Sequence, residues 1–398
     1  MARARRVARR PAVCRGARRP AIATVVKVVE VINVDFSLRH FVLPLMRAAR
    51  DAGHEVIGAC AEGPLLAPAR VEGFRVVALP PMRSLSPVAA WRAYRALVHL
   101  FRAERPDLVH AHMPISGFVA RMAAWRAGVP RIAYTCHGFL FNQPGPWPRR
   151  FASFAMEFLA GRVTTTFLTV SAEEARDASR LHIAGAPIAV LNGRDPARFH
   201  PDATAREHIR AALGVASDRV VVIAVSRLVR HKGLIELAHA LRDIDAELWV
   251  VGDRLPSDRG PDIAAALRAA GLGERLRLLG YREDVPALLA AAEIFALPSH
   301  FEGLPMSVIE AMLTALPVVA TDIRGPREQI VDNETGLLVP PATVPPLAIA
   351  LSRLATDPAL RTRMGEAGRR RALDLYDESA VLARTLDALG LSAHPPPP

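Results

Sequence analysis

The 398-residue sequence predicts an α/β protein with two Rossmann-like, doubly wound parallel sheets that face a central cleft. Apolar runs of strand length alternate with segments of helix length, as expected for parallel strands connected by helices. The alternation restarts after the segment LNGRDPARFHP, and the chain is too long for one ordinary core. We therefore expect two domains. None of the apolar runs is long enough to cross a bilayer.

The strand assignments follow from the apolar runs. In the first domain we expect strands within residues 25–34, 54–60, 74–79, 107–112 and 131–138, with a turn at residues 35–39 (DFSLR). In the second domain we expect strands in VVVIAVSR, ELWVVGD, LRLLGY, EIFALP, PVVATD and TGLLV. Loops that follow such strands lie at the carboxyl edge of the sheet, where open α/β folds bind ligands.

The segments outside the two sheets have their own interpretations. Residues 1–20 are basic and lack the apolar segment of a secretory signal. We favour a disordered extension; a start codon placed too far upstream and a basic arm for lipid or nucleic acid stay open. The domains are predicted at residues 21–195 and 196–375, followed by a helix at 376–390 and a loose tail at 391–398.

The formal charge of +12 is concentrated in the first half of the chain. Residues 1–20 carry +8, residues 21–190 carry +7 and residues 191–398 carry −3. A basic half can face nucleic acid, an anionic membrane or a phosphorylated acceptor, but no nucleic-acid-binding motif is present, so we expect no nucleic-acid partner. The three cysteines are far apart, which favours neither a disulfide framework nor a zinc site and fits a reducing cytoplasm.

The stretch from Ser299 to Gly336 contains the strongest candidate site. A loop with Glu302 and Gly303 precedes a helix expected from about residue 306 to 316, whose first N–H groups can bind an anion. Glu302 and Glu310 are eight residues apart, so they face roughly the same side if both are helical. Carboxylates beside an anion site suit a sugar nucleotide. The alternative is a loop charge and a solvated helix residue, but Glu310 lies among apolar positions and needs a partner there.

Other candidates lie at predicted strand ends. Arg227 and Lys232, in SRLVRHKG, are either a clamp for a diphosphate or two solvated loop cations. His112 and His137 either reach a substrate or are structural hydrogen-bonding groups. The Asp-x-Asp sequence at residues 243–245 precedes a strand, so we interpret it as a solvated loop rather than a metal site.

The ordered motifs FEGLPMSVIEAM, PVVATD, GPREQIVD and TGLLVPP closely resemble the retaining glycosyltransferases of family 4, which have the GT-B fold. The resemblance is to members that build polysaccharides and lipid-linked oligosaccharides. It implies that residues 21–195 form the acceptor domain and residues 196–375 the nucleotide-sugar donor domain. It also implies that the helix at 376–390 can cross back to the first domain.

The resemblance further implies roles for individual residues. The catalytic residues would be His137, Glu302, Arg227 and Lys232. The donor site would comprise Arg227, Lys232, Tyr281, Arg282, Glu302, Gly303, Leu304 and Glu310, with the backbone near Tyr281 and Arg282 at the nucleobase and Glu310 at the ribose. Glu328 would be a further acid. Many members have Gly-Gly where this chain has Phe36-Ser37; Ser37 can still donate a hydrogen bond, and with His112 it is assigned to the acceptor side.

The function implied is transfer of a hexosyl or N-acetylhexosaminyl group, with retention, from a nucleotide-diphosphate sugar, with UDP favoured. The acceptor would be a polyprenyl-diphosphate-linked glycan in surface polysaccharide biosynthesis, and neither a metal nor a cofactor is expected. A nucleotide-sugar epimerase of the same architecture and a non-catalytic binding subunit are the alternatives. Basic amphipathic segments at residues 91–101 and 146–162 are either ordinary core-facing helices or membrane contacts. We expect a cytoplasmic protein, with peripheral attachment to the inner face of the membrane as an option.

Overall fold

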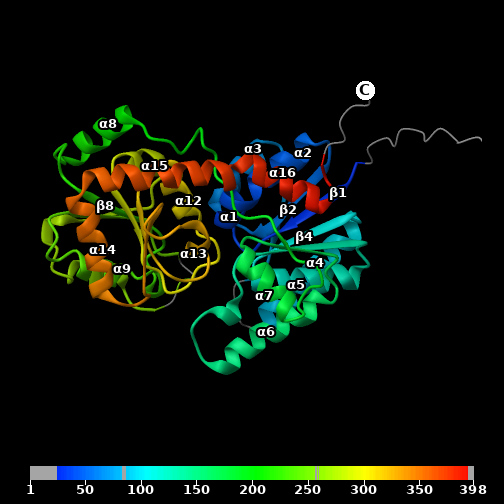
Figure 1. Cartoon of the computed structure of the whole chain (residues 1–398). Coiled ribbons are helices and arrows are strands. Elements are labelled where there is room, and N and C mark those ends of the chain that lie inside the picture. Colours follow the sequence, from blue (N-terminus) through cyan, green and yellow to red (C-terminus); the bar gives the residue numbers. More distant parts are fainter. Residues whose placement is uncertain (1–24, 83–86, 256–257, 259, 393–398) are drawn as a thin grey trace, which may run out of the picture.

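A computed structural model describes residues 25–82, 87–255, 258 and 260–392. Two lobes lie side by side, each with a parallel sheet covered by helices on both faces (Figure 1). The predicted extension at residues 1–20 and the last six residues of the predicted tail lie outside the described residues. The α/β prediction with two doubly wound sheets is confirmed.

The first lobe has a seven-stranded sheet in the order β3-β2-β1-β4-β5-β6-β7. Its strands are β1 (Lys27–Val31), β2 (Glu55–Ala61), β3 (Arg75–Leu79), β4 (Leu108–His112), β5 (Arg131–Cys136), β6 (Thr166–Thr169) and β7 (Ile188–Ala189). Its helices are α1 (Asp35–Ser37), the π-helical η1 (Leu38–Val42), α2 (Leu43–Asp51), η2 (Pro64–Leu66), α3 (Ala67–Val71), α4 (Pro87–Glu104), α5 (Pro114–Ala127), η3 (Leu140–Asn142), α6 (Trp147–Gly161) and α7 (Ala172–Arg180).

Two features of this lobe differ from the prediction. Strands β6 and β7 were not predicted, because β6 contains two threonines among four residues and β7 has only two residues. The expected turn at residues 35–39 is helical, and it runs through η1 into α2. The carboxylate of Asp35 accepts the backbone N–H groups of Phe36 (2.8 Å) and of Leu65 in η2 (3.1 Å), so it ties the start of α1 to η2.

The second lobe has a six-stranded sheet in the order β10-β9-β8-β11-β12-β13, and all six predicted strands are present. They are β8 (Val221–Val225), β9 (Glu247–Val251), β10 (Leu276–Gly280), β11 (Ile294–Leu297), β12 (Val318–Thr321) and β13 (Gly336–Val339). The helices are α8 (Ala203–Leu213), η4 (Arg230–Lys232), α9 (Leu234–Ala240), α10 (Ile263–Arg268), η5 (Gly273–Arg275), α11 (Val285–Ala290), α12 (Met306–Leu313), α13 (Pro326–Gln329), α14 (Val344–Thr356) and α15 (Pro358–Leu375).

Both sheets are buried on both faces, which explains why their strands are nearly continuous apolar runs. In the first lobe, α4 and α5 pack on one face while α2, α3 and α16 pack on the other. In the second lobe, α8, α11, α12 and α15 cover one face and α9, α10 and α14 the other. The carboxyl ends of the central strands of both lobes are therefore left to loops, and these loops form the site.

The last helix belongs to the first lobe in space. Helix α15 passes from the second lobe toward the first, and α16 (Glu378–Leu389) then packs against α2 (Figure 1). Leu386 and Leu389 join the core that contains Val28 and Met46. The predicted loose tail is wrong for Leu391, which is buried, because its N–H donates to the Leu386 carbonyl at 2.7 Å.

The two chain crossings between the lobes are hydrogen-bonded to each other. The N–H of Arg194 donates to the carbonyl of Tyr376 at 3.0 Å, and the N–H of Glu378 donates to the carbonyl of Arg194 at 3.1 Å. Elsewhere in the described part of the chain, Cys60 and Cys136 are buried free thiols. Among the helices described, none combines the length and the apolar character required to span a membrane.

Candidate active site

The lobes meet where two glycine-containing loops touch. Gly303, in the loop between β11 and α12, lies directly against the carbonyl oxygen of His137, which follows β5. A Cβ atom on Gly303 would stand 2.6 Å from that oxygen, so only glycine permits this approach. Gly138 has a φ of 116° and lies against Gly303 from the other side. This contact joins the two lobes.

Lys232 and Glu302 form an ion pair beside the contact of Gly303 with His137. Lys232 ends η4 after β8, and Glu302 stands just before Gly303; their charged atoms are 2.6 Å apart and both side chains are largely buried. The sequence predicted both residues in the donor site but not their pairing. A donor phosphate that approached Lys232 would compete with the Glu302 carboxylate.

Arg227 is also paired in this structure. Its guanidinium forms an ion pair with Asp258, whose carboxylate also accepts the N–H of Leu255 at 3.0 Å. The two cations predicted to bind a diphosphate thus lie on the loop after β8, each beside a carboxylate. The Asp-x-Asp sequence at residues 243–245 lies just before β9, at the opposite edge of the sheet, where Asp245 is exposed and paired with Arg219.

Glu310 has a partner that the sequence did not reveal. It lies within α12, and one carboxylate oxygen accepts the Arg194 Nε–H at 2.6 Å. Arg194, in the crossing between the lobes, also donates to the carbonyl of His40 in η1 at 3.2 Å. Glu302 and Glu310 are therefore held by different cations, with Glu302 outside the helix and Glu310 within it.

The remaining predicted donor residues follow β10 and β11. Tyr281 is half exposed, and Arg282 pairs with Asp284 at 2.7 Å. Their loop reaches the first lobe, since Glu283 forms a 3.0 Å ion pair with Arg39. Leu304 is buried, and its carbonyl accepts the side-chain amide of Asn192 at 2.8 Å. The backbone of this loop is thereby held against the crossing between the lobes.

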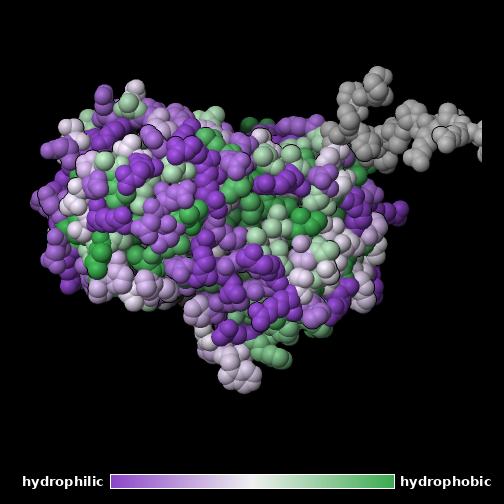
Figure 2. All heavy atoms as spheres, in the orientation of Figure 1, coloured by the Kyte–Doolittle hydropathy of each residue, from purple (hydrophilic) through white to green (hydrophobic). Residues whose placement is uncertain are grey.

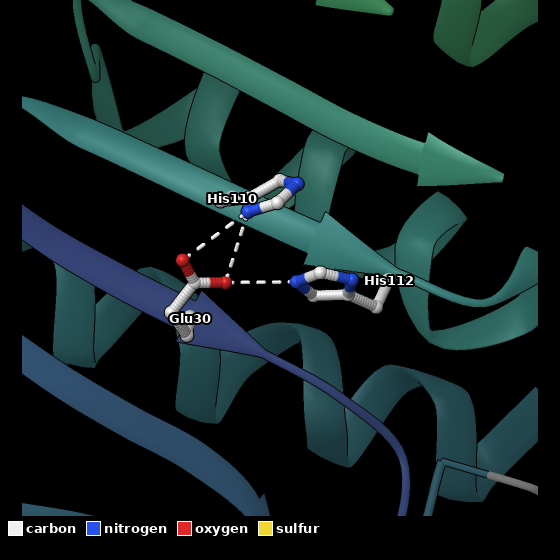
Figure 3. A group of neighbouring side chains, drawn as sticks. All are labelled: Glu30, His110 and His112. Atoms are coloured by element: carbon white, nitrogen blue, oxygen red, sulfur yellow. Dashed lines mark hydrogen bonds and ion pairs between the residues drawn. The ribbon is translucent and has the colours of Figure 1, made fainter. Parts of the chain in front are cut away.

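The two predicted histidines contact each other. His112 Nδ1 lies 3.2 Å from His137 Nε2, and His112 Nε2 lies 2.8 Å from an oxygen of Glu30. Glu30 on β1 also contacts His110 on β4, and His110 and His112 approach the same carboxylate (Figure 3). The sequence analysis missed Glu30 and His110. An acid inside an apolar strand (KVVEV) and the two-residue spacing of His110 and His112, which places them on one face, were the available signals.

The two residues predicted for the acceptor side, Ser37 and His112, differ in whether they line a pocket. A pocket at the carboxyl edge of the first sheet contains His112 and His137 together with His40, Phe41 and Arg194. Ser37 is buried in α1, whereas His40 and Phe41, which follow it in η1, line this pocket. Phe41 lies edge-on to His137, with ring centroids 5.9 Å apart. His40 and Phe41 were not identified from the sequence.

Glu328 lies in the second lobe and caps a helix of the first. Its carboxylate accepts the Ser171 hydroxyl (2.6 Å) and the N–H groups of Ala172 (2.8 Å) and Glu173 (2.7 Å), at the start of α7. The exposed N–H groups and the helix dipole favour a carboxylate at this position. Arg324 supports the contact through a 2.9 Å ion pair with Asp177. Glu328 thus joins the lobes.

Glu174 lies close to the same contact and is fully buried. One of its oxygens accepts the N–H of Phe139 at 3.2 Å, and the other has no partner among the described residues. Burial raises the pKa of Glu174 to about 8, and the nearby charge of Glu328 adds to the effect. The carboxyl is therefore protonated at neutral pH.

Comparison with known proteins agrees with this geometry. The family model described as Glycosyl transferase 4-like domain matches residues 38–193, and the model Glycosyl transferases group 1 matches residues 205–371. The chain is 29% identical to an Escherichia coli protein named UDP-Gal:alpha-D-GlcNAc-diphosphoundecaprenol alpha-1,3-galactosyltransferase, over 70% of this chain and 74% of that protein. It is 32% identical to the Mycolicibacterium smegmatis GDP-mannose-dependent alpha-(1-6)-phosphatidylinositol monomannoside mannosyltransferase, over 67% of this chain and 72% of that protein.

The solved structures agree on the fold. Anabaena HepE, solved with UDP and glucose, superposes with a TM-score of 0.78 at 21% identity, over 92% of this chain and 99% of that chain. The two parallel-sheet lobes and this superposition show the GT-B fold. The two matched models and the curated relatives show that the chain belongs to the family 4 glycosyltransferases.

Because Gly303 contacts the His137 carbonyl, adding one methyl group at Gly303 should strongly reduce the transfer activity. We expect Gly303→Ala to reduce transfer activity about 100-fold, because the new Cβ must displace the His137 carbonyl and a shift of about 1 Å in a reacting site has this order of effect. Gly185→Ala is the matched control, since a Cβ there meets nothing within 4 Å. Equal activity of the two variants in a steady-state assay would contradict the assigned role of this contact.

Glu174 predicts a pH dependence of stability. Its pKa is about 8 in the folded protein and near 4.5 in an unfolded chain, so the folded state binds the extra proton between these values. The free energy of unfolding therefore decreases as pH rises through this window, by at most about 1.4 kcal/mol per pH unit. Glu174→Gln cannot ionise, so its melting temperature relative to wild type should rise from pH 5 to about pH 8 and then level off. The exposed Glu334→Gln should stay parallel to wild type; parallel curves for both variants would refute the assignment.

Proposed function

We propose that this glycosyltransferase moves a sugar from a UDP-sugar to a hydroxyl of a polyprenyl-diphosphate-linked glycan, with retention at the anomeric carbon and without a metal ion. The observation that carries the proposal is the convergence of Lys232, Glu302 and the Gly303–His137 contact at the base of the cleft. This convergence supports a site in which a cation would bind the diphosphate beside a carboxylate that would accept the sugar hydroxyls. The name of the Escherichia coli relative, which includes both a UDP-sugar and a diphosphoundecaprenol acceptor, supports this choice of substrates.

The paired cations supply what the leaving group requires. A donor diphosphate would exchange its oxygens for the carboxylates that now hold Lys232 and Arg227, and the cations would then stabilise the charge that develops as the sugar departs. Glu302, released from Lys232, would accept hydrogen bonds from the sugar. Glu310 would accept from the ribose hydroxyls while Arg194 keeps it oriented.

In the proposed reaction the acceptor oxygen attacks the face that the diphosphate leaves. The bond from the anomeric carbon to the diphosphate oxygen breaks, a bond to the acceptor oxygen forms, and the acceptor proton passes to the diphosphate. This scheme requires no protein base. Metal independence is supported by the position of the Asp-x-Asp sequence, whose residues lie at the edge of the sheet away from the cleft.

Two other functions fit the same fold and differ in their products. A nucleotide-sugar epimerase would convert one UDP-sugar to another without an acceptor. A non-catalytic subunit would bind the donor and form no product. Both alternatives would bind a nucleotide sugar through the same cations and carboxylates, so the product formed distinguishes them from a transferase. Whether the transferred group is a hexose or an N-acetylhexosamine is tested by the thermal-shift experiment with UDP-sugars.

A lipid-linked acceptor requires access to a membrane, and α6 provides a suitable surface. Trp147 and Phe151, four residues apart on α6, are 75% and 63% exposed, and Leu159 is exposed two turns later. Arg149 and Arg150 are exposed between them. Figure 2 shows pale and green spheres at the lower tip of the molecule, over α6 and the loop before it. An apolar face with flanking arginines is typical of a helix that lies on an anionic membrane. Helix α4 is less suitable, because its Phe101 and Leu97 belong to the core.

The donor prediction is tested by thermal shift. UDP-sugars, but not GDP- or ADP-sugars, should raise the melting temperature of the wild-type protein, and EDTA should not change the shift; at 100 times Kd the stabilisation is about 2.7 kcal/mol. Lys232→Ala should lose the shift and the transfer activity. Glu310→Ala should lose activity, whereas Arg230→Ala, whose side chain pairs with Glu236 outside the cluster, should keep both. No shift with any nucleotide sugar would refute the donor site, and epimerised UDP-sugar without transfer would favour the epimerase.

The membrane prediction is tested by flotation with vesicles of phosphatidylethanolamine and phosphatidylglycerol. The double variant Trp147→Ser, Phe151→Ser should bind at least about 10-fold more weakly, since each apolar side chain contributes about 1.5–3 kcal/mol when buried and 1.4 kcal/mol is a factor of ten. Ile349→Ser is the control, because Ile349 is 70% exposed but lies on α14 of the other lobe. Unchanged binding of the double variant would remove α6 from the proposal.

A further inference from the structure

A buried carboxylate lies behind the histidine that borders the cleft. Glu30 and His110 are direct neighbours across β1 and β4, and both are completely buried. His112, almost completely buried, lies between Glu30 and His137 (Figure 3 shows Glu30, His110 and His112). The chain of contacts therefore runs from the core of the first sheet to the contact between the lobes. None of the steps proposed above uses Glu30.

The first contact of this chain fixes one proton. Burial alone would raise the pKa of Glu30, but the adjacent His110 and His112 outweigh it and lower the pKa to about 2. Glu30 is therefore an anion with no proton to donate. The 2.8 Å contact between Glu30 and His112 Nε2 needs a hydrogen, so His112 Nε2 must carry it.

The second contact then fixes another proton. Burial lowers the pKa of His112 to about 4, so its ring is neutral and has only one N–H. That N–H is at Nε2, and Nδ1 is left as an acceptor. The 3.2 Å contact with His137 must therefore use a hydrogen on His137 Nε2. Burial also lowers the pKa of His137 well below its usual value, so His137 is neutral and its Nδ1 has a lone pair.

We propose that Glu30 is a positioning residue that acts through His112 to fix the tautomer of His137, so that His137 presents Nδ1 to the cleft as a hydrogen-bond acceptor for a substrate hydroxyl. His137 lines the pocket with Phe41, Arg194 and Met306, and its own carbonyl touches Gly303. A fixed acceptor there selects a hydroxyl and not a phosphate oxygen, since a phosphate oxygen has no proton to donate at neutral pH. The identity of the hydroxyl, on the donor sugar or the acceptor, rests on the proposed function; the tautomer does not.

The same three buried side chains could instead hold a divalent cation, and this would reverse the tautomer. Atoms of Glu30, His110 and His112 lie within 4.8 Å of one another, which a single ion could bridge. With a metal on His112 Nε2, the remaining proton of His112 would sit on Nδ1 and donate to His137 Nε2. His137 would then carry its proton on Nδ1 and offer a donor to the cleft. The contacts of 2.8 Å and 3.0 Å are ordinary hydrogen-bond lengths and favour the metal-free arrangement.

The tautomer can be measured directly in the full chain without any substrate. Long-range ¹H–¹⁵N correlation spectra of ¹⁵N-histidine-labelled protein distinguish a protonated from an unprotonated ring nitrogen, and His137→Gln identifies the signals of His137. We expect a protonated Nε2 and an unprotonated Nδ1 in His137 at pH 7. The opposite pattern would overturn the proposal. So would one equivalent of a divalent metal, found by elemental analysis in wild type and absent from Glu30→Gln.

Variants connect the tautomer to turnover. Glu30→Gln removes the anion that fixes the proton on His112, so His137 should populate both tautomers and kcat should fall at least about 10-fold with little change in the donor KM; a wrong histidine tautomer can cost far more in other enzymes. Glu30→Asp keeps the charge and should restore the single tautomer and part of kcat. Glu157→Gln is the control for a buried substitution of the same kind, since Glu157 is hydrogen-bonded to Arg121 and Tyr134 and, among the described residues, has no hydrogen bond to His112 or His137.

The outcomes of these measurements are separable from those of the donor experiment. If Glu30→Gln does not fold, the wild-type spectrum still decides the tautomer of His137. If no UDP-sugar binds, the proposed function fails, while the spectrum tests the role of Glu30 by itself. If Glu157→Gln alters the His137 tautomer as much as Glu30→Gln does, the effect is a general consequence of disturbing the core and the assigned role of Glu30 is wrong.

Discussion

The constraint on which the cleft depends is that charges removed from water need partners. Lys232 is held by Glu302, Arg194 by Glu310, and Glu328 by the first N–H groups of α7. An unpaired charge at these buried positions would cost several kcal/mol, so each pair is needed for the folded state. Two of these three contacts also connect a residue of one lobe to the crossing or to the other lobe. The same contacts therefore neutralise the charges and hold the two lobes in their arrangement.

This coupling has a consequence for substrate binding. In the proposed function, a diphosphate that reached Lys232 and Arg227 would take over the cations that neutralise Glu302 and Asp258. The released carboxylates would need new hydrogen-bond donors, which the hydroxyls of a sugar would provide. A sugar nucleotide would thus replace both members of each ion pair, the diphosphate taking the place of the carboxylate and the sugar hydroxyls that of the cation. A simple phosphate would leave Glu302 without a partner.

Several of these partners could not be found from the sequence, because pairing is a property of packing. Lys232 and Glu302 are 70 residues apart, and Ser171 and Glu328 are 157 apart. Arg194 lies in an irregular segment where neither periodicity nor a motif marks it. Glu30 gave a signal, an acid within an apolar strand, but its meaning depends on the neighbouring strand β4, whose register brings His110 beside it. The close approach of the Gly303 backbone to His137 could not be predicted either, because its only sign in the sequence is the glycine itself.

The sequence by itself determined the elements and their class. Runs of buried apolar residues separated by helices dictate two parallel sheets, because a strand covered on both faces must be apolar along its length. The same logic placed the loops with Arg227, Lys232 and Glu302 at the carboxyl edges. The tertiary structure alone decided which charges neutralise one another, that Leu391 packs on the first lobe, and that Glu328 caps α7. These contacts join segments far apart in the chain, and the energy that selects them exists only once both lobes are folded.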